Sequence, residues 1–163
     1  MTPEPTPGAA VQVTAKADYA LRALAELATV DPAAGPVKAE AIAHAQGIPL
    51  NFLENILLEL RHAGLVTAQR GATGGYALAR PAADITLADA IRAVDGPLAN
   101  VRGQRPDQLE YGGSARLLRD VWVAVRANLR AVLEQVTVAD LVDGALPPAV
   151  AALTADPDAW SRR

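Results

Sequence analysis

The sequence contains no cysteine and few aromatic residues or histidines. Among 163 residues there is no cysteine, 4% are aromatic and two are histidines. Without thiols, the chain supplies no disulfide, no thiolate nucleophile and no cysteine ligand for zinc or an iron–sulfur cluster. A histidine-based metal site would need both His44 and His62, carboxylates or a second subunit. We therefore expect neither a bound metal nor a cofactor.

Long apolar runs are also missing. No stretch reaches the roughly 18 apolar residues of a membrane span, and residues 1–8 lack the basic and apolar regions of a secretory signal. We expect a cytoplasmic protein that does not contact membranes. The formal net charge of −3 argues against coating nucleic acid by bulk attraction. Any DNA binding would therefore require a local basic patch.

The apolar half of the sequence is rich in alanine and leucine, which favours helices over large sheets. Helical periodicity is found at 14–30, 39–46, 49–64, 86–96, 114–136 and 138–142. Two alternating stretches, 65–68 and 76–79, flank a glycine-rich turn and predict a hairpin. The short helices on either side of Gly47 are typical of a helix-turn-helix. We therefore predict a mainly α fold: a winged helix-turn-helix with a two-stranded β-wing and a long C-terminal dimerisation helix.

The predicted elements divide the chain into four parts. Residues 1–12, rich in proline, are expected to form a flexible tail. Residues 13–81 are expected to form the winged helix-turn-helix domain, the part that would bind DNA. Residues 82–143 comprise a connecting helix, a loop with the character of an effector site and the dimerisation helix. Residues 144–163 are expected to form a C-terminal tail.

The helix predicted over 114–136 has an apolar stripe along its length. Its members recur every three or four residues: Leu118, Val121, Val125, Leu129, Val132 and Val136. A helix of about 34 Å is too long to bury this stripe on so small a domain. A second subunit is the natural cover, so we expect a homodimer.

The distribution of charge favours DNA binding over catalysis. No acidic residue lies between Glu59 and Asp84, a window that contains Arg61, Arg70 and Arg80. A helix fits the major groove, and a hairpin with arginine reaches the adjacent minor groove or phosphates. The sequence has no phosphate-binding glycine loop, nucleophile elbow or zinc-protease motif. We therefore expect no enzymatic activity.

Three motifs occur in order along the chain: residues 15–24 (AKADYALRAL), residues 52–57 with 60–66 (FLENIL, LRHAGLV) and residues 70–81 (RGATGGYALARP). Together they resemble the Rrf-two family of winged helix-turn-helix regulators. The resemblance extends over about residues 13–143. It implies a homodimeric transcription factor, usually a repressor, whose third helix and wing contact double-stranded DNA. It also implies that the long helices cross at the dimer interface.

One feature departs from this family. Cluster-binding members carry three cysteines in the loop before the long helix, whereas residues 100–113 contain none. The sequence therefore predicts a member without an iron–sulfur cluster. Its sensory input would come from another ligand or a protein partner, or would be absent.

Candidate DNA-binding residues are drawn from the start of the first helix, the third helix and the wing. They are Lys16, Tyr19, Arg22, Asn51, Phe52, Glu54, Asn55, Arg61, Arg70, Thr73, Gly74 and Gly75. Arg70 begins the wing turn, where the glycines allow close approach to DNA. Glu54 could accept a hydrogen bond from cytosine N4, or be an ordinary solvated carboxylate. Asn51 could pair with adenine or cap the helix.

Candidate effector-binding residues lie in and after the loop. Arg102 and Arg105 could hold an anion, with Tyr111 and Trp122 beside them. The simpler alternatives are a salt-bridge cluster for the arginines and packing in the dimer core for Trp122. We predict a dimeric, sequence-specific DNA-binding repressor. The alternative hypothesis is a winged-helix protein–protein interaction module without specific DNA binding.

Overall fold

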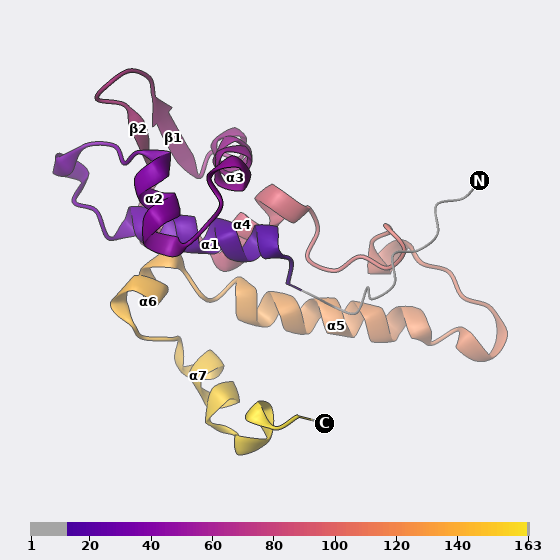
Figure 1. Ribbon diagram of the computed structural model, residues 1–163. Helices are drawn as coiled ribbons and strands as arrows, with labels where there is room; N and C mark the ends of the chain where they lie inside the picture. Colours follow the sequence, from indigo (N-terminus) through magenta and orange to yellow (C-terminus); the bar gives the residue numbers. More distant parts are fainter. Residues whose placement is uncertain (1–12, 163) are drawn as a thin grey trace, which may run out of the picture.

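The computed structural model describes residues 13–162, so the flexible tail expected over 1–12 lies outside the described residues. The described chain is mainly helical with one two-stranded antiparallel sheet, which confirms the predicted fold class (Figure 1). Its helices are α1 (Ala15–Ala28), α2 (Ala39–Gln46), α3 (Leu50–His62), α4 (Leu87–Asp95), α5 (Leu118–Leu133), α6 (Val138–Asp143) and α7 (Pro148–Ala155). The strands are β1 (Val66–Gln69) and β2 (Gly75–Leu78).

The helix-turn-helix is formed by α2 and α3. Gly47 ends α2 in the left-handed conformation, with φ of 63°, which glycine adopts without steric cost. Pro49 immediately precedes α3, whereas the sequence pattern predicts it inside the helix at the first position. The apolar side of α3 is buried through Leu53, Ile56 and Leu57, so its opposite side faces outward.

The wing is a short hairpin that pairs with a third segment. Strands β1 and β2 are antiparallel, from Val66 opposite Leu78 to Gln69 opposite Gly75. Val37, just before α2, forms an antiparallel bridge with Tyr76, in which each backbone N–H donates to the other's carbonyl at 2.8 and 2.7 Å. These two hydrogen bonds tie the wing to the helix-turn-helix.

The apolar core is centred on α1, which contacts α2, α3, α4 and α6. Ala20 and Leu24 of α1 are fully buried, and small alanines on this helix let its neighbours approach closely. Ile85 and Val138, on either side of α5 in the sequence, belong to the same core cluster. The core of the winged-helix domain therefore includes residues beyond the boundary expected at residue 81.

Two identical capping boxes position α4 and α6. Thr86 and Asp89 satisfy each other's backbone N–H groups at the start of α4, as the sequence indicated. Thr137 and Asp140 do the same for α6. Thr86 and Thr137 also form an antiparallel bridge, so the two helices start side by side.

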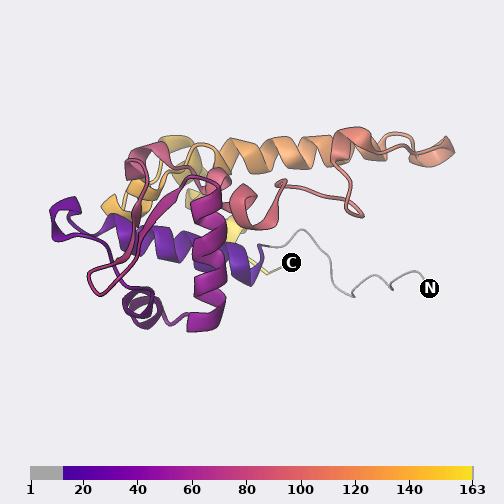
Figure 2. The same cartoon turned by 90° about the horizontal axis from the view of Figure 1, so that it is seen from above.

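Helix α5 is shorter than predicted and has no buried residue. The expected range was 114–136, but residues 113–115 form a 3-10 turn and the backbone C=O of Val136 accepts a hydrogen bond from Leu87 at 2.9 Å. After Leu133 the chain leaves the helix and pairs with the segment before α4, through this hydrogen bond, the Val138 N–H to the Ile85 carbonyl, and the Thr86–Thr137 bridge. Figure 2 shows that α5 projects well beyond the packed helices at its N-terminal end.

The segment after α6 contains more structure than the sequence pattern predicts. Helix α7 and a 3-10 turn at Pro157–Trp160 occupy much of the expected tail, 144–163. Pro148 begins α7 at a position that suits proline, and this signal was available in the sequence. Among the helices in residues 13–162, none combines the length and apolar character that a membrane crossing requires.

Candidate nucleic-acid interface

The outward side of α3 presents a polar surface. Asn51, Glu54 and Asn55 are all exposed, and none of their side chains forms a hydrogen bond or ion pair within residues 13–162. Phe52, 57% exposed, lies at the edge of this surface. Donors and acceptors that have no partner in the protein are free to contact the edges of base pairs. Four predicted residues are thereby brought onto one accessible side of one helix.

The starts of α2 and α3 are open to an anion. Neither helix has a side chain that caps its first turn, because Lys38 and Pro49 occupy the capping positions. The first backbone N–H groups of each helix therefore have no side-chain acceptor, and the helix dipole at such an end favours an anion such as phosphate. Positive partial charge thus reinforces the basic side chains nearby.

Arg70 in the wing and Arg61 on α3 are cations that no carboxylate in the described chain neutralises, whereas Arg80 after β2 forms an ion pair with Asp89 at 3.9 Å. Arg70 and Thr73 are exposed in the wing turn, and Arg61 is exposed near the end of α3. Neither arginine has an acidic partner among the described residues. The ammonium group of Lys38 donates to the Gly71 carbonyl at 3.1 Å, which brings a further cation to the tip of the wing.

Gly74 and Gly75 are explained by the protein's own backbone. A Cβ on Gly74 would lie 2.1 Å from the Gln69 carbonyl oxygen, and one on Gly75 would lie 2.5 Å from that of Val37. Gly75 also has φ of 150°, which side chains rarely tolerate. Gly74 is buried. Closure of the hairpin requires these glycines, whatever their distance from DNA.

The candidate residues of α1 are engaged within the protein. Lys16 forms an ion pair with Glu59 of α3 at 2.7 Å. Arg22 donates to the Gln46 carbonyl at 2.7 Å and lies over the Tyr19 ring, 4.8 Å from its centroid. These contacts join α1 to α2 and α3. The predicted contact of Lys16, Tyr19 and Arg22 with phosphate stays a prediction.

Sequence reasoning missed two residues of this surface. Lys38 was passed over because it lies outside the wing in sequence, although the Val37 bridge brings it there. Leu58 is 47% exposed one turn after Glu54, where an apolar side chain could contact a thymine methyl group. Its position four residues after Glu54 was a signal in the sequence for placing it on the outward side.

The four candidate effector residues do not form one cluster. The Trp122 indole N–H donates to the Tyr111 hydroxyl at 3.1 Å, and Arg102 lies over the Tyr111 ring at 5.8 Å. Arg102 is the one non-glycine residue in 13–162 with positive φ, at 52°. Arg105 instead forms an ion pair with Asp107 at 3.3 Å. Three of the four are therefore grouped, and Arg105 belongs to a different set of contacts.

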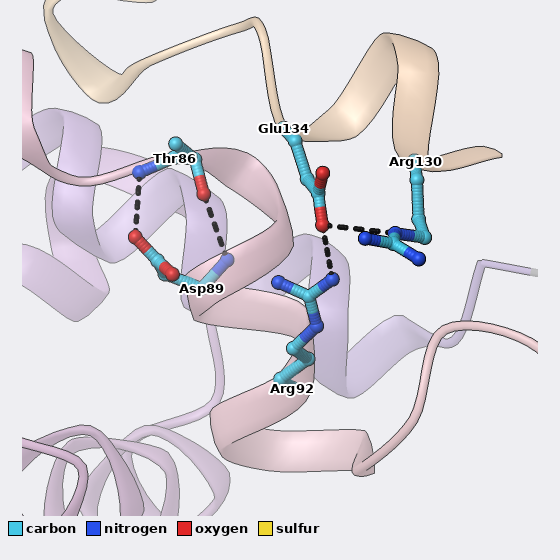
Figure 3. Close-up of polar contacts among 5 residues, drawn as sticks. All are labelled: Thr86, Asp89, Arg92, Arg130 and Glu134. Carbon is cyan, nitrogen blue, oxygen red and sulfur yellow. Dashed lines mark hydrogen bonds and ion pairs between the residues drawn. The ribbon is translucent and has the colours of Figure 1, made fainter. Parts of the chain in front are cut away.

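Two carboxylates near this loop are each shared by two arginines. Glu134 accepts from Arg92 at 2.5 Å and from Arg130 at 3.2 Å (Figure 3). Asp107 accepts from Arg126 and from Arg105. The hydrogen bond from Arg126 holds the pKa of Asp107 below its usual range, and the one from Arg92 does the same for the pKa of Glu134. Both carboxylates are therefore ionised near neutral pH.

Comparison with known proteins identifies the family of this fold. Residues 13–144 match the Rrf2 family, described as an iron-dependent transcriptional regulator. The chain is 50% identical over 147 residues to the HTH-type regulator Rv1287 of Mycobacterium tuberculosis, covering 90% of each. It is 34% identical over 133 residues to IscR of Escherichia coli, covering 82% of this chain and 81% of IscR.

A solved structure agrees with this match. CymR, the global cysteine regulator of Bacillus subtilis, superimposes with a TM-score of 0.68 at 33% identity. The alignment covers 82% of this chain and 97% of CymR. The likeness therefore includes nearly the whole of that regulator.

The iron dependence in the family description does not fit the residues of this chain. The sequence has no cysteine, so it supplies no thiolate to an iron–sulfur cluster. Within residues 13–162, no three His, Asp or Glu side chains are grouped as metal ligands would be. The loop from Arg102 to Tyr111 instead contains two arginines and one tyrosine.

The exposed α3 surface, the cationic wing and the match across 13–144 all indicate the same identity. The chain belongs to the Rrf2 family and is a DNA-binding helix-turn-helix transcriptional regulator, not an enzyme.

Proposed function

We propose that this chain is a homodimeric, sequence-specific repressor that acts in the cytoplasm without an iron–sulfur cluster. Its input is a small ligand or a protein partner. Membership of the Rrf2 family supports DNA binding. The lack of cysteine supports the absence of an iron–sulfur cluster.

One observation supports it above the others: α3 places its unpartnered polar side beside the cationic wing. The side chains of Asn51 and Glu54 have no partner within the described chain, while Arg70 has no neutralising carboxylate there. In such an arrangement, α3 enters the major groove and selects bases, and the wing fixes the register on the phosphates.

The dimer is supported by α5. Its apolar stripe runs along a 16-residue helix in which no residue is buried. In the stripe, Val121 is exposed and Leu118, Val125, Leu129 and Val132 are half-buried, whereas Val136 is buried in the core of the single chain. Apolar surface left open along a helix favours association. Two copies related by a two-fold axis would present two α3 helices about 34 Å apart, so the expected operator is partly palindromic.

Selection of bound fragments from random DNA, followed by binding assays on the best site, tests this function. Arg70→Ala should weaken binding to most sequences and lower the salt dependence of log Kd by about one. Glu54→Ala should relax preference at one base pair and leave the salt dependence unchanged. Arg119→Ala, an exposed change on α5 away from the wing, is the control and should retain wild-type binding.

A selection that enriches no sequence would contradict specific recognition. It would favour the alternative in which the same winged helix docks on a protein. Equal effects of the Arg70 and Glu54 changes on every sequence would contradict the division of roles between wing and helix.

A further inference from the structure

A groove between the end of α4 and α5 is lined by four arginines. It has a volume of about 440 Å³ and lies between the end of α4, the turn at Pro106–Gln108 and α5. Its charged lining residues are Arg92, Arg105, Arg126 and Arg130, and Gly96, Pro97 and Leu98 complete it. Small-molecule sites generally measure about 300–1,000 Å³. The groove is therefore large enough for a metabolite.

The groove has an excess of positive charge. The four arginines share two carboxylates, Glu134 and Asp107, and neither carboxylate is among the lining residues. Four positive charges against two negative charges leave a surplus of two, in a chain whose net charge is −3. A local surplus of positive charge gives the groove a positive potential that attracts anions.

The guanidinium groups retain donors for a ligand. Each has five N–H donors, and each of these arginines uses one nitrogen in its contact with Glu134 or Asp107. Those carboxylates thereby orient the arginines without exhausting them. Arg126, whose side chain is 20% exposed, is the most enclosed of the four. Planar guanidinium groups bind oxyanions through paired hydrogen bonds.

We propose that this groove binds a small oxyanion with at least two negative charges. The two surplus positive charges match a ligand with two negative charges, and the apolar Pro97 and Leu98 can contact its carbon skeleton. Phosphate esters and polycarboxylates share this chemistry. Of the four candidate effector residues, Arg105 lines this groove, and Arg102, Tyr111 and Trp122 do not.

The position of the groove gives the ligand a regulatory role, an inference that rests on the proposed function. One wall is α4, which packs on α1 and α3 and so belongs to the DNA-binding domain. The other wall is α5, the proposed dimerisation helix. An anion held by Arg92 and Arg126 bridges the two walls and alters the placement of α3 relative to the dimer axis. Ligand binding should therefore change operator affinity.

Titration calorimetry on the full chain, without DNA, tests the site. Phosphate, sulfate and citrate are each added against chloride at matched ionic strength. In the variant R105Q/R130Q, the tightest of these anions should bind at least about tenfold more weakly. This variant leaves Arg126 on Asp107 and Arg92 on Glu134, so the fold is retained. The control R116Q/R119Q makes the same change in net charge on exposed arginines outside the groove, and should shift the affinity less than about twofold.

The anions separate the two ligand classes. Tighter phosphate or sulfate binding assigns a phosphorylated or sulfated ligand, and tighter citrate binding assigns a polycarboxylate. Absence of binding above the chloride baseline overturns the proposal, as does equal weakening in the two double variants. Because this assay contains no DNA, its result is independent of whether the protein represses.

A second assay tests the regulatory role. The tightest anion should change the affinity of the wild-type protein for its selected operator and leave that of R105Q/R130Q unchanged. An operator affinity that the anion does not alter overturns regulation through the groove.

Discussion

Some residues of the wing are required by the fold of the hairpin, and others are free to contact DNA. Gly74 and Gly75 lie against the carbonyl oxygens of Gln69 and Val37, where no side chain fits. The arginine near them in the turn, Arg70, is by contrast exposed. Substitutions here therefore separate into those that disturb the fold and those that remove a DNA contact.

Gly75→Ala should lower the free energy of unfolding by about 1–3 kcal/mol, because the new methyl group meets the Val37 carbonyl in a strained backbone conformation. Urea denaturation measures this change. Gly112→Ala is the matched control, since Gly112 has φ of −100° and a methyl group added there would meet nothing within 4 Å, so it should be nearly neutral. Equal losses for the two variants would refute the steric explanation.

The shared carboxylates predict a dependence of stability on pH. Arginine contacts lower the folded-state pKa of Asp107 and Glu134, so their contribution is complete above the unfolded value of about 4. It is lost as the pH falls through the lower folded-state values. Urea denaturation between about pH 3 and 6 should show a smaller acid-induced loss for D107N/E134Q than for wild type. Because both groups are exposed, high salt should reduce the difference.

At the level of helices, the paired capping boxes connect α4 to α6. Both helices begin with threonine followed three residues later by aspartate, and Thr86 and Thr137 are bridged through the backbone. The arrangement joins the segment before α4 to the segment after α5. It also keeps α4 in place as one wall of the arginine groove.

Thr86→Ala should destabilise the protein by about 1 kcal/mol, because the N–H of Asp89 loses its side-chain acceptor. Thermal and urea unfolding both report the change. Thr154→Ala in α7 removes an exposed hydroxyl that bonds only its own helix, at the Ala151 carbonyl, and should have little effect. A loss of the same size for Thr154 would show that capping is not the cause.

For the whole molecule, α5 is the helix through which we expect two chains to form a dimer. Val121 is 49% exposed on a helix with no buried residue, so a charge there leaves the monomer core intact. Val121→Asp should yield the mass of a single chain in analytical ultracentrifugation, where wild type gives twice that mass. Operator affinity should fall by about 100-fold through loss of the paired half-site.

Ala127→Asp is the control for this prediction. It adds the same charge to an exposed position of α5 outside the apolar stripe, and should preserve the dimer. A wild-type protein that sediments as one chain would contradict the dimer, whatever the behaviour of the variants.

Much of the fold and of the DNA-facing surface followed from local patterns. The periodicities at 39–46 and 76–79 and the capping box at Thr86 predict elements that the structure contains, because helix and strand periods depend on neighbouring residues. The exposed side of α3 follows from the same reasoning: once Leu53 and Ile56 face the core, Glu54 faces away. The end of α5 did not follow from local patterns, because the chain after Leu133 pairs with residues 85–87, which are distant in sequence.

The sequence by itself determined the family, the helix-turn-helix and the absence of thiolate ligands, since each depends on residue identity and local spacing. Tertiary structure alone decided that Lys38 reaches the wing, that Gly75 must lack a side chain and that four arginines line one groove. Those arginines come from α4, the loop and α5, and the first and last of them, Arg92 and Arg130, are far apart in the chain. Only the packing of distant segments brings such charges together, because no local period relates them.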